Sequence, residues 1–168
     1  MLGFVLADTN ITDLRQRAYV LATIKHECAQ KWVPIREFGG PSYWSKYEGR
    51  SEIGNTQLGD GVRFHGRGFV MPTGRGTYDR LGKALGIDLV SNPDLALNDN
   101  ISYEIASVGM RLGLFTQGGR SLARYIPPGG PPDYVNARRV VNGTDKAELI
   151  ASYAEHYEKL LRLIREGT

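Results

Sequence analysis

Apolar residues recur at helical spacing over several stretches of the chain. The clearest stretch runs from about Thr12 to Gln30, where they return every three or four positions between Ile11 and Cys28. Such spacing places them on one face of a helix, and Pro34 prevents the helix from continuing. The same pattern predicts further helices over residues 77–85, 101–114, 134–141 and 144–165.

The stretch between Phe38 and Gly68 has no such period and is rich in glycine. This composition predicts long ordered loops and a small β-hairpin with a tight turn near Asp60-Gly61. Loops of this length in a compact domain are often functional. We therefore expect residues 1–168 to form a single, mainly helical α+β domain, made of a helical part, a small irregular or β-hairpin lobe and a cleft between them.

Charge and hydropathy exclude several functions. The chain has 21 Lys and Arg against 18 Asp and Glu, a net charge of +3 that favours anionic partners. Its basic residues are dispersed, so we expect no nucleic-acid binding, and no apolar run is long enough for stable insertion into a membrane. The basic amphipathic segment Lys159–Arg165 is either an ordinary core helix or a surface that disturbs anionic membranes. The first residues do not resemble a secretory signal, so we expect synthesis in the cytoplasm.

The motifs for metal or cofactor chemistry are incomplete. His26-Glu27 would need a second histidine at Gln30 to form a zinc-protease helix. Gly66-Arg67-Gly68 lacks the third glycine of a dinucleotide loop. Cys28 is the only cysteine and lies on the apolar stripe, so we interpret it as an inert core residue. We expect neither a metal nor a cofactor.

Two glutamates are candidates for acid–base chemistry. Glu27 lies beside the apolar stripe at the end of the first predicted helix, where desolvation would keep a carboxyl group protonated, as a general acid requires. Glu48 lies in the irregular lobe, where an ordered loop can aim a carboxylate at a substrate. The spacing alone also allows two ordinary surface glutamates. Two carboxyl groups together would permit hydrolysis of a glycosidic bond.

Six short motifs occur in a familiar order: Lys25-His26-Glu27, Tyr47-Glu48-Gly49-Arg50, Gly54-Asn55-Thr56, the run from Gly59 to Val70, Thr73-Gly74-Arg75, and the run from Arg138 to Gly143. Together they resemble glycoside hydrolase family 19, which contains plant-type chitinases and bacteriophage endolysins. The similarity is greatest to the compact endolysin branch and extends from about Ile11 to Leu161. It implies a lysozyme-like fold.

The resemblance implies roles for individual residues. Glu27 matches the family's general acid, Glu48 its general base, and Thr73 the hydroxyl that helps to hold the attacking water. Residues expected to contact substrate are His26, Tyr47, Arg67, Arg75, Tyr78, Arg139 and Asn142, although each arginine could instead brace the fold. The chain departs from the family at Met71-Pro72, where a glutamine and an aliphatic residue are usual, and this change affects the placement of Thr73.

These roles lead to a functional prediction. We expect a monomeric endolysin that hydrolyses β-1,4 bonds between N-acetylated sugars of bacterial peptidoglycan with inversion. It would be made in the cytoplasm of the bacterial host and act on the cell wall in the periplasm, after release through a membrane lesion or as part of a virion. The alternatives are a chitinase and a glycan-binding wall protein without turnover.

Overall fold

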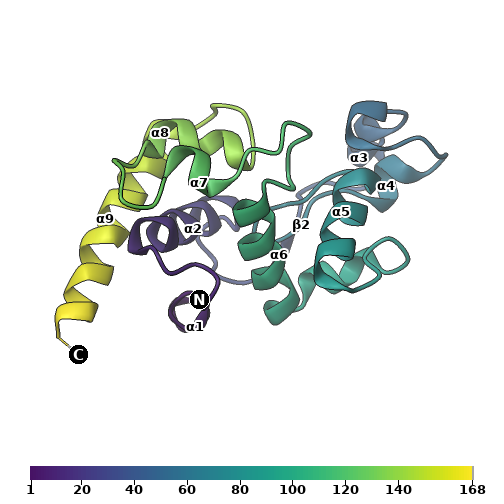
Figure 1. Cartoon of the computed structure of the whole chain (residues 1–168). Coiled ribbons are helices and arrows are strands. Elements are labelled where there is room, and N and C mark those ends of the chain that lie inside the picture. Colours follow the sequence, from purple (N-terminus) through teal and green to yellow (C-terminus); the bar gives the residue numbers. More distant parts are fainter. Residues whose placement is uncertain (168) are drawn as a thin grey trace. The chain divides into compact units, whose positions relative to one another are not determined.

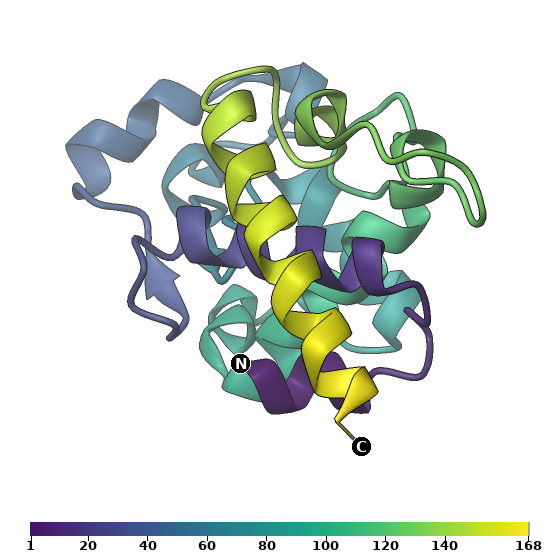
Figure 2. The ribbon, with the colours of Figure 1, turned by 90° about the vertical axis from the view of Figure 1, so that its left-hand side faces the viewer.

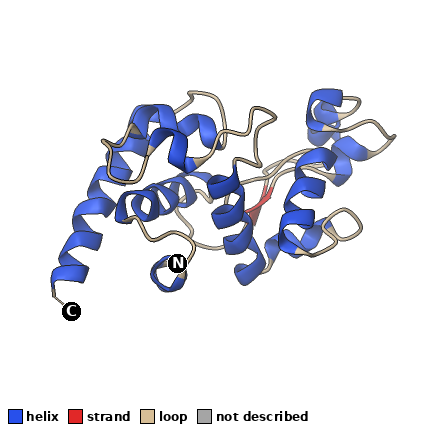
Figure 3. Cartoon of the chain, in the orientation of Figure 1, coloured by secondary structure: helices blue, strands red, loops and turns tan. Residues whose placement is uncertain are grey.

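The computed structural model describes residues 1–167, which are mostly helical (Figure 1, Figure 3). The longer helices are α2 (Leu14–Glu27), α5 (Arg75–Leu85), α6 (Asp99–Leu112) and α9 (Ala147–Glu166). Short helices are α1 (Leu2–Ala7), α3 (Pro41–Trp44), α4 (Asp60–Arg63), α7 (Leu122–Tyr125) and α8 (Tyr134–Ala137). Single 3-10 turns are η1 (Ser45–Tyr47), η2 (Ser51–Ile53), η3 (Pro93–Leu97) and η4 (Arg138–Val140). None of the helices in residues 1–167 is long and apolar enough to cross a bilayer.

The chain forms two compact units. The first contains Met1–Trp32 and the chain from Gly109 onward, and the second contains Val33–Val108. Helix α6 starts in the second unit and ends in the first. The mainly helical class and the predicted helices are confirmed, although the segment 134–141 divides into α8 and η4. Whether the chain acts as a single domain stays a prediction.

The core of the first unit lies between α2 and α9, which cross and pack against each other (Figure 2). Helix α2 begins after Asp13, whose carboxylate accepts the Arg15 backbone N–H at 2.9 Å. Asp13 thus caps the N-terminus of the helix. Most positions of the two predicted apolar stripes are buried, at Ala18, Leu21, Ile24, Cys28, Ile150, Ala154 and Leu161. Leu14 and Tyr157 are only partly buried, and Ile164 is 39% exposed.

The second unit contains a two-stranded antiparallel sheet in place of the expected hairpin. Strand β1 (Ile35–Arg36) pairs with β2 (Arg67–Gly68), so the connection between them is about thirty residues of loops and short helical turns. The segment around Asp60-Gly61 forms helix α4, so the prediction of a tight hairpin turn there is wrong. The Asp60 side chain accepts two backbone amides of its own loop, which favours a helical turn over a hairpin.

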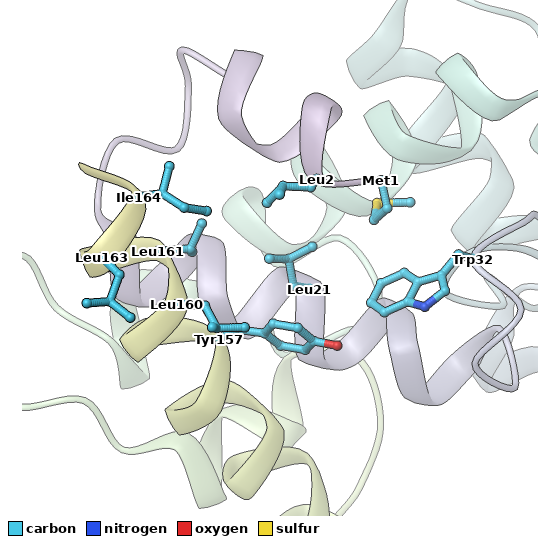
Figure 4. Close-up of a pocket in the computed structure, with 9 residues that line it drawn as sticks. All are labelled: Met1, Leu2, Leu21, Trp32, Tyr157, Leu160, Leu161, Leu163 and Ile164. Carbon is cyan, nitrogen blue, oxygen red and sulfur yellow. The ribbon is translucent and has the colours of Figure 1, made fainter. Parts of the chain in front are cut away.

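An apolar groove of about 450 Å³ lies in the first unit, where the last turns of α9 meet α1 and the end of α2 (Figure 4). Its lining residues are Met1, Leu2, Leu21, Trp32, Tyr157, Leu160, Leu161, Leu163 and Ile164. Leu163 is 65% exposed, whereas Leu161 is buried. None of the predicted site residues lines this groove, and the effect of Lys159–Arg165 on membranes stays a prediction.

Candidate functional site

Glu27 is the last residue of α2 and forms an ion pair with a buried arginine. Arg138 Nη1 donates to Glu27 Oε1 at 2.6 Å, and the two side chains are 2% and 15% exposed. The sequence predicted an apolar surrounding for Glu27, and the structure adds a guanidinium in contact with its carboxylate. Glu27 Oε2 has no hydrogen-bond partner among residues 1–167. One carboxylate oxygen is thus fixed by Arg138, and the other has room for a further hydrogen bond.

Arg138 was not predicted as a site residue, whereas its neighbour Arg139 was. The turn η4 directs Arg138 inward, where its Nε also donates to the Asp145 carbonyl at 3.0 Å. Arg139 is partly exposed, and its Nε lies 3.4 Å from Asn136 Oδ1. The sequence contains an arginine pair followed by two valines, but the phase of a three-residue turn cannot be read from so short a pattern.

Glu48 follows η1 in the second unit and is held by the backbone of another loop. Gly59 N–H donates to Glu48 Oε1 at 2.6 Å, and Gly61 N–H donates to Oε2 at 2.8 Å. Both oxygens therefore accept a hydrogen bond, and such bonds to an ionised acceptor are stronger than neutral ones. A carboxylate has about four lone-pair positions, so two remain for water or substrate. The site predicted at Glu48 thus has a defined geometry.

Tyr47, the residue before Glu48, is held by two hydrogen bonds within the second unit. Its hydroxyl donates to Glu37 Oε1 at 2.7 Å, and its carbonyl accepts from Asn55 Nδ2 at 2.9 Å. Burial, followed by the hydrogen bond to Glu37, raises the pKa of Tyr47 above its ordinary value. Lys46 Nζ lies 3.2 Å from the same Glu37 oxygen. The predicted substrate contact of Tyr47 is untested, but its hydroxyl is already engaged within the unit.

Two predicted substrate-binding residues lie in the interior of the second unit. Tyr78 is fully buried and donates to the His65 carbonyl at 2.9 Å. Arg67 is 4% exposed, donates through Nη1 to the same carbonyl at 2.9 Å and pairs with Asp94 at 2.7 Å. Both side chains brace the interior of the unit, and their contact with a substrate stays a prediction.

Arg75 also braces the second unit. Its guanidinium contacts Asp60, with Nη2 at 2.6 Å from Oδ1, and Asp60 is only 1% exposed. Burial opposes ionisation of Asp60, but the Arg75 guanidinium and the amides of Gln57 and Thr56 outweigh it and lower the pKa of that carboxyl. Of the two alternatives for Arg75, the structure favours bracing.

The remaining candidates have local contacts only. Thr73 is partly exposed, and its hydroxyl donates to the Met71 carbonyl at 3.0 Å, so it faces its own loop. Met71 has a φ of +53°, a strained value for a side chain of this size. Asn142 is exposed, with Oδ1 accepting from Gly143 N–H at 2.8 Å. His26 is partly exposed on the last turn of α2.

Cys28 and His65 are both buried and have contacts inside the protein. Cys28 is fully buried, as predicted, and its Sγ accepts from the Trp32 backbone N–H at 3.3 Å. His65 stacks on Trp44 with ring centroids 3.6 Å apart, and burial lowers its pKa. Residues 1–167 contain no group of three or more His, Cys, Asp or Glu side chains placed to hold a metal ion.

Solved structures with a similar fold come from bacteria. Chitinase C from Streptomyces griseus HUT6037 superimposes with a TM-score of 0.68 at 18% identity, over 95% of this chain and 64% of the other. A second bacterial family 19 chitinase gives 0.62 at 21% identity, over 95% and 80%. At these identities the likeness establishes the lysozyme-like, helix-rich fold alone.

Curated relatives with a similar sequence come from plants. A basic endochitinase of Vitis vinifera is 31% identical over 114 residues, which are 62% of this chain and 36% of the relative. An endochitinase of Avena sativa is 33% identical over 96 residues, 56% and 40% of the two chains. An acidic 27 kDa endochitinase of Solanum lycopersicum is 47% identical over 51 residues, 30% and 20% of the two. The chain thus matches no more than two fifths of these relatives.

The family model described as chitinase class I matches residues 3–111, about two thirds of the chain. That range contains both predicted catalytic glutamates and five of the six motifs, from Lys25-His26-Glu27 to Thr73-Gly74-Arg75. Because the match extends over more than half of the chain, and the fold agrees with it, the chain belongs to glycoside hydrolase family 19, the class I chitinases.

Proposed function

We propose that this protein is a glycoside hydrolase that cleaves β-1,4 bonds in polymers of N-acetylglucosamine, as a chitinase does. The observation that carries the proposal is the family match over residues 3–111, which includes Glu27 and Glu48. Relatives that match over 96 and 114 residues are named as endochitinases, and this supports chitin over the peptidoglycan expected from the sequence. Their names alone do not decide the substrate, so the experiment below compares both polymers.

In the proposed reaction, Glu27 is the general acid. Arg138 fixes Oε1, and a proton on Oε2 is transferred to the glycosidic oxygen as the bond to the sugar breaks. Glu48 is the general base and takes a proton from the attacking water with a lone pair that Gly59 and Gly61 leave free. Water adds to the opposite face of the oxocarbenium-like sugar, so the configuration at the anomeric carbon inverts.

The inverting mechanism sets a geometric requirement. The two carboxyl groups of such enzymes stand roughly 6.5–9.5 Å apart, which leaves room for the water. A structure with a bound chitin oligosaccharide would measure this separation directly. A separation near about 5 Å would indicate a covalent intermediate and retention instead.

The test uses the purified full chain with a hexamer of N-acetylglucosamine, and proton NMR records the first anomer released. We expect the α-anomer first, because inversion converts a β-linkage. Glu27→Gln and Glu48→Gln should each lower the rate about a hundredfold or more. Glu52→Gln is the matched control, because the Glu52 side chain is 57% exposed and forms an ion pair with Arg50 at the protein surface. If both variants retain full activity, the assignment of the acid and the base is wrong.

Peptidoglycan is the second candidate substrate, favoured by the net charge of +3 and the anionic bacterial wall. The same variants are therefore assayed on purified sacculi for release of reducing ends. Faster hydrolysis of sacculi than of the hexamer would support the endolysin and its proposed site of action at the host cell wall. Binding to either polymer without any release of reducing ends would favour the non-catalytic alternative, a glycan-binding protein.

A further inference from the structure

In the turn Gly59-Asp60-Gly61, the two glycine amides bind Glu48 and the Asp60 side chain is buried in the protein. Its two glycine amides point at Glu48 and bind one carboxylate oxygen each, at 2.6 Å and 2.8 Å. The Asp60 side chain between them points into the protein, where it is 1% exposed. A carboxylate held by two backbone donors keeps one orientation, whereas a free glutamate side chain samples many rotamers.

Each glycine is needed for a different physical reason. Gly59 has a φ of +90°, which favours glycine because a Cβ is strained in that conformation. Gly61 has an ordinary φ, but a Cβ there would lie 2.6 Å from the Glu48 backbone nitrogen and 2.8 Å from Oε2. The close approach of the turn to Glu48 therefore depends on the missing side chain at position 61.

The other side of the turn is braced by a buried network. Asp60 Oδ2 accepts the backbone amides of Thr56 and Gln57 at 3.1 Å and 3.0 Å, and its carboxylate pairs with Arg75. Asn55, fully buried, accepts the Arg75 backbone N–H at 2.7 Å and donates to the carbonyl of Tyr47, the residue before Glu48. The same network thus fixes the turn and the backbone beside the carboxylate.

We propose that the Gly59-Asp60-Gly61 turn is a positioning element that orients the Glu48 carboxylate toward the attacking water. This inference rests on the proposed function, because it assumes that Glu48 is the general base. The turn has no predicted contact with the reacting atoms. The turn acts by orienting the Glu48 carboxylate, so that its two unused lone pairs face the water. A misplacement of a reacting group by about 1 Å can lower the rate about a hundredfold.

The first test needs no activity. In a nitrogen–proton correlation spectrum of the wild type, the Gly59 and Gly61 amide protons should lie downfield, as expected for donors to a carboxylate. Glu48→Gln replaces the ionised acceptor with a neutral amide and should move both resonances upfield. Glu52→Gln, in the same unit, should move neither. Unchanged glycine resonances in Glu48→Gln would overturn the proposal, whatever the activity of the protein.

The second test is kinetic and uses Gly61→Ala. We expect kcat on the chitin hexamer to fall about tenfold or more while KM stays within about twofold, because the base is misaligned and the substrate contacts remain. Gly40→Ala is the matched control, since a Cβ at position 40 meets no atom within 4 Å and its φ is not positive. It should retain the wild-type kcat.

The two tests separate the proposals. If Glu48→Gln is inactive but Gly61→Ala, folded by circular dichroism, matches Gly40→Ala, the positioning role is wrong and the proposed function stands. If Glu48→Gln moves the glycine resonances but keeps full activity, Glu48 is not the base, and both proposals fail at that residue. If Gly61→Ala does not fold, the Glu48→Gln spectrum alone decides whether the contact exists.

Discussion

The Arg138–Glu27 ion pair allows a quantitative prediction about stability. Replacing Arg138 with methionine removes the 2.6 Å contact to Glu27 and the 3.0 Å contact to the Asp145 carbonyl. Glu27, whose side chain is only 15% exposed in the native structure, then lacks its counter-charge. Breaking a buried pair by removing one partner costs about 3–5 kcal/mol. Since Glu27 keeps some contact with water, we expect a loss of about 3 kcal/mol in the free energy of unfolding.

Urea unfolding followed by far-ultraviolet circular dichroism measures this loss. The fluorescence of Trp32 and Trp44 provides a second probe, because one tryptophan lies in each compact unit. Coincident transitions would justify a two-state analysis. At about 2–4 °C per kcal/mol for a chain of this size, the melting temperature should fall by about 6–12 °C.

Two further variants make the reasoning refutable. Arg139→Met removes a neighbouring, partly exposed arginine and should change stability by less than about 0.5 kcal/mol. Glu27→Gln combined with Arg138→Met should cost less than the sum of the single changes, with a coupling energy of about 1–3 kcal/mol. If Arg138→Met is no more destabilising than Arg139→Met, the pair does not anchor Glu27, and the account of the acid given above is wrong.

Three other predictions concern stability and accessibility. The pKa of Asp60 is lowered, so its pairing with Arg75 stabilises the protein at pH values above the unfolded pKa of about 3.9. This stabilisation is lost as the pH falls through the folded pKa, and the urea midpoints of wild type and Asp60→Asn should therefore converge in acid. A difference between the two midpoints that does not change with pH would contradict this. Gly74→Ala should lower the melting temperature strongly, since φ is +89° and a Cβ would lie 2.5 Å from the Ile53 carbonyl oxygen. Cys28 should react with a thiol reagent only in denaturant, and rapid labelling of the native protein would show that it is not buried.

The glycine-rich composition around Asp60 did not determine the local backbone structure. Gly59-Asp60-Gly61 predicts a tight hairpin turn, yet it forms the start of α4, because Asp60 binds amides of its own loop and Arg75. Glycine and aspartate are common both in hairpin turns and at the start of a helix, so the local sequence fits either structure. The choice depends on an arginine fifteen positions away along the chain.

The sequence by itself determined the helical class, the buried faces of α2 and α9, and the order of the motifs that include Glu27 and Glu48. These properties follow from local periodicity and residue type, which the chain displays directly. Only the tertiary structure decided that Arg138 pairs with Glu27 across 111 positions and that Arg67 and Tyr78 are buried. It alone brought the Gly61 amide to Glu48. Contacts between distant segments depend on how the elements pack, and no local pattern encodes that packing.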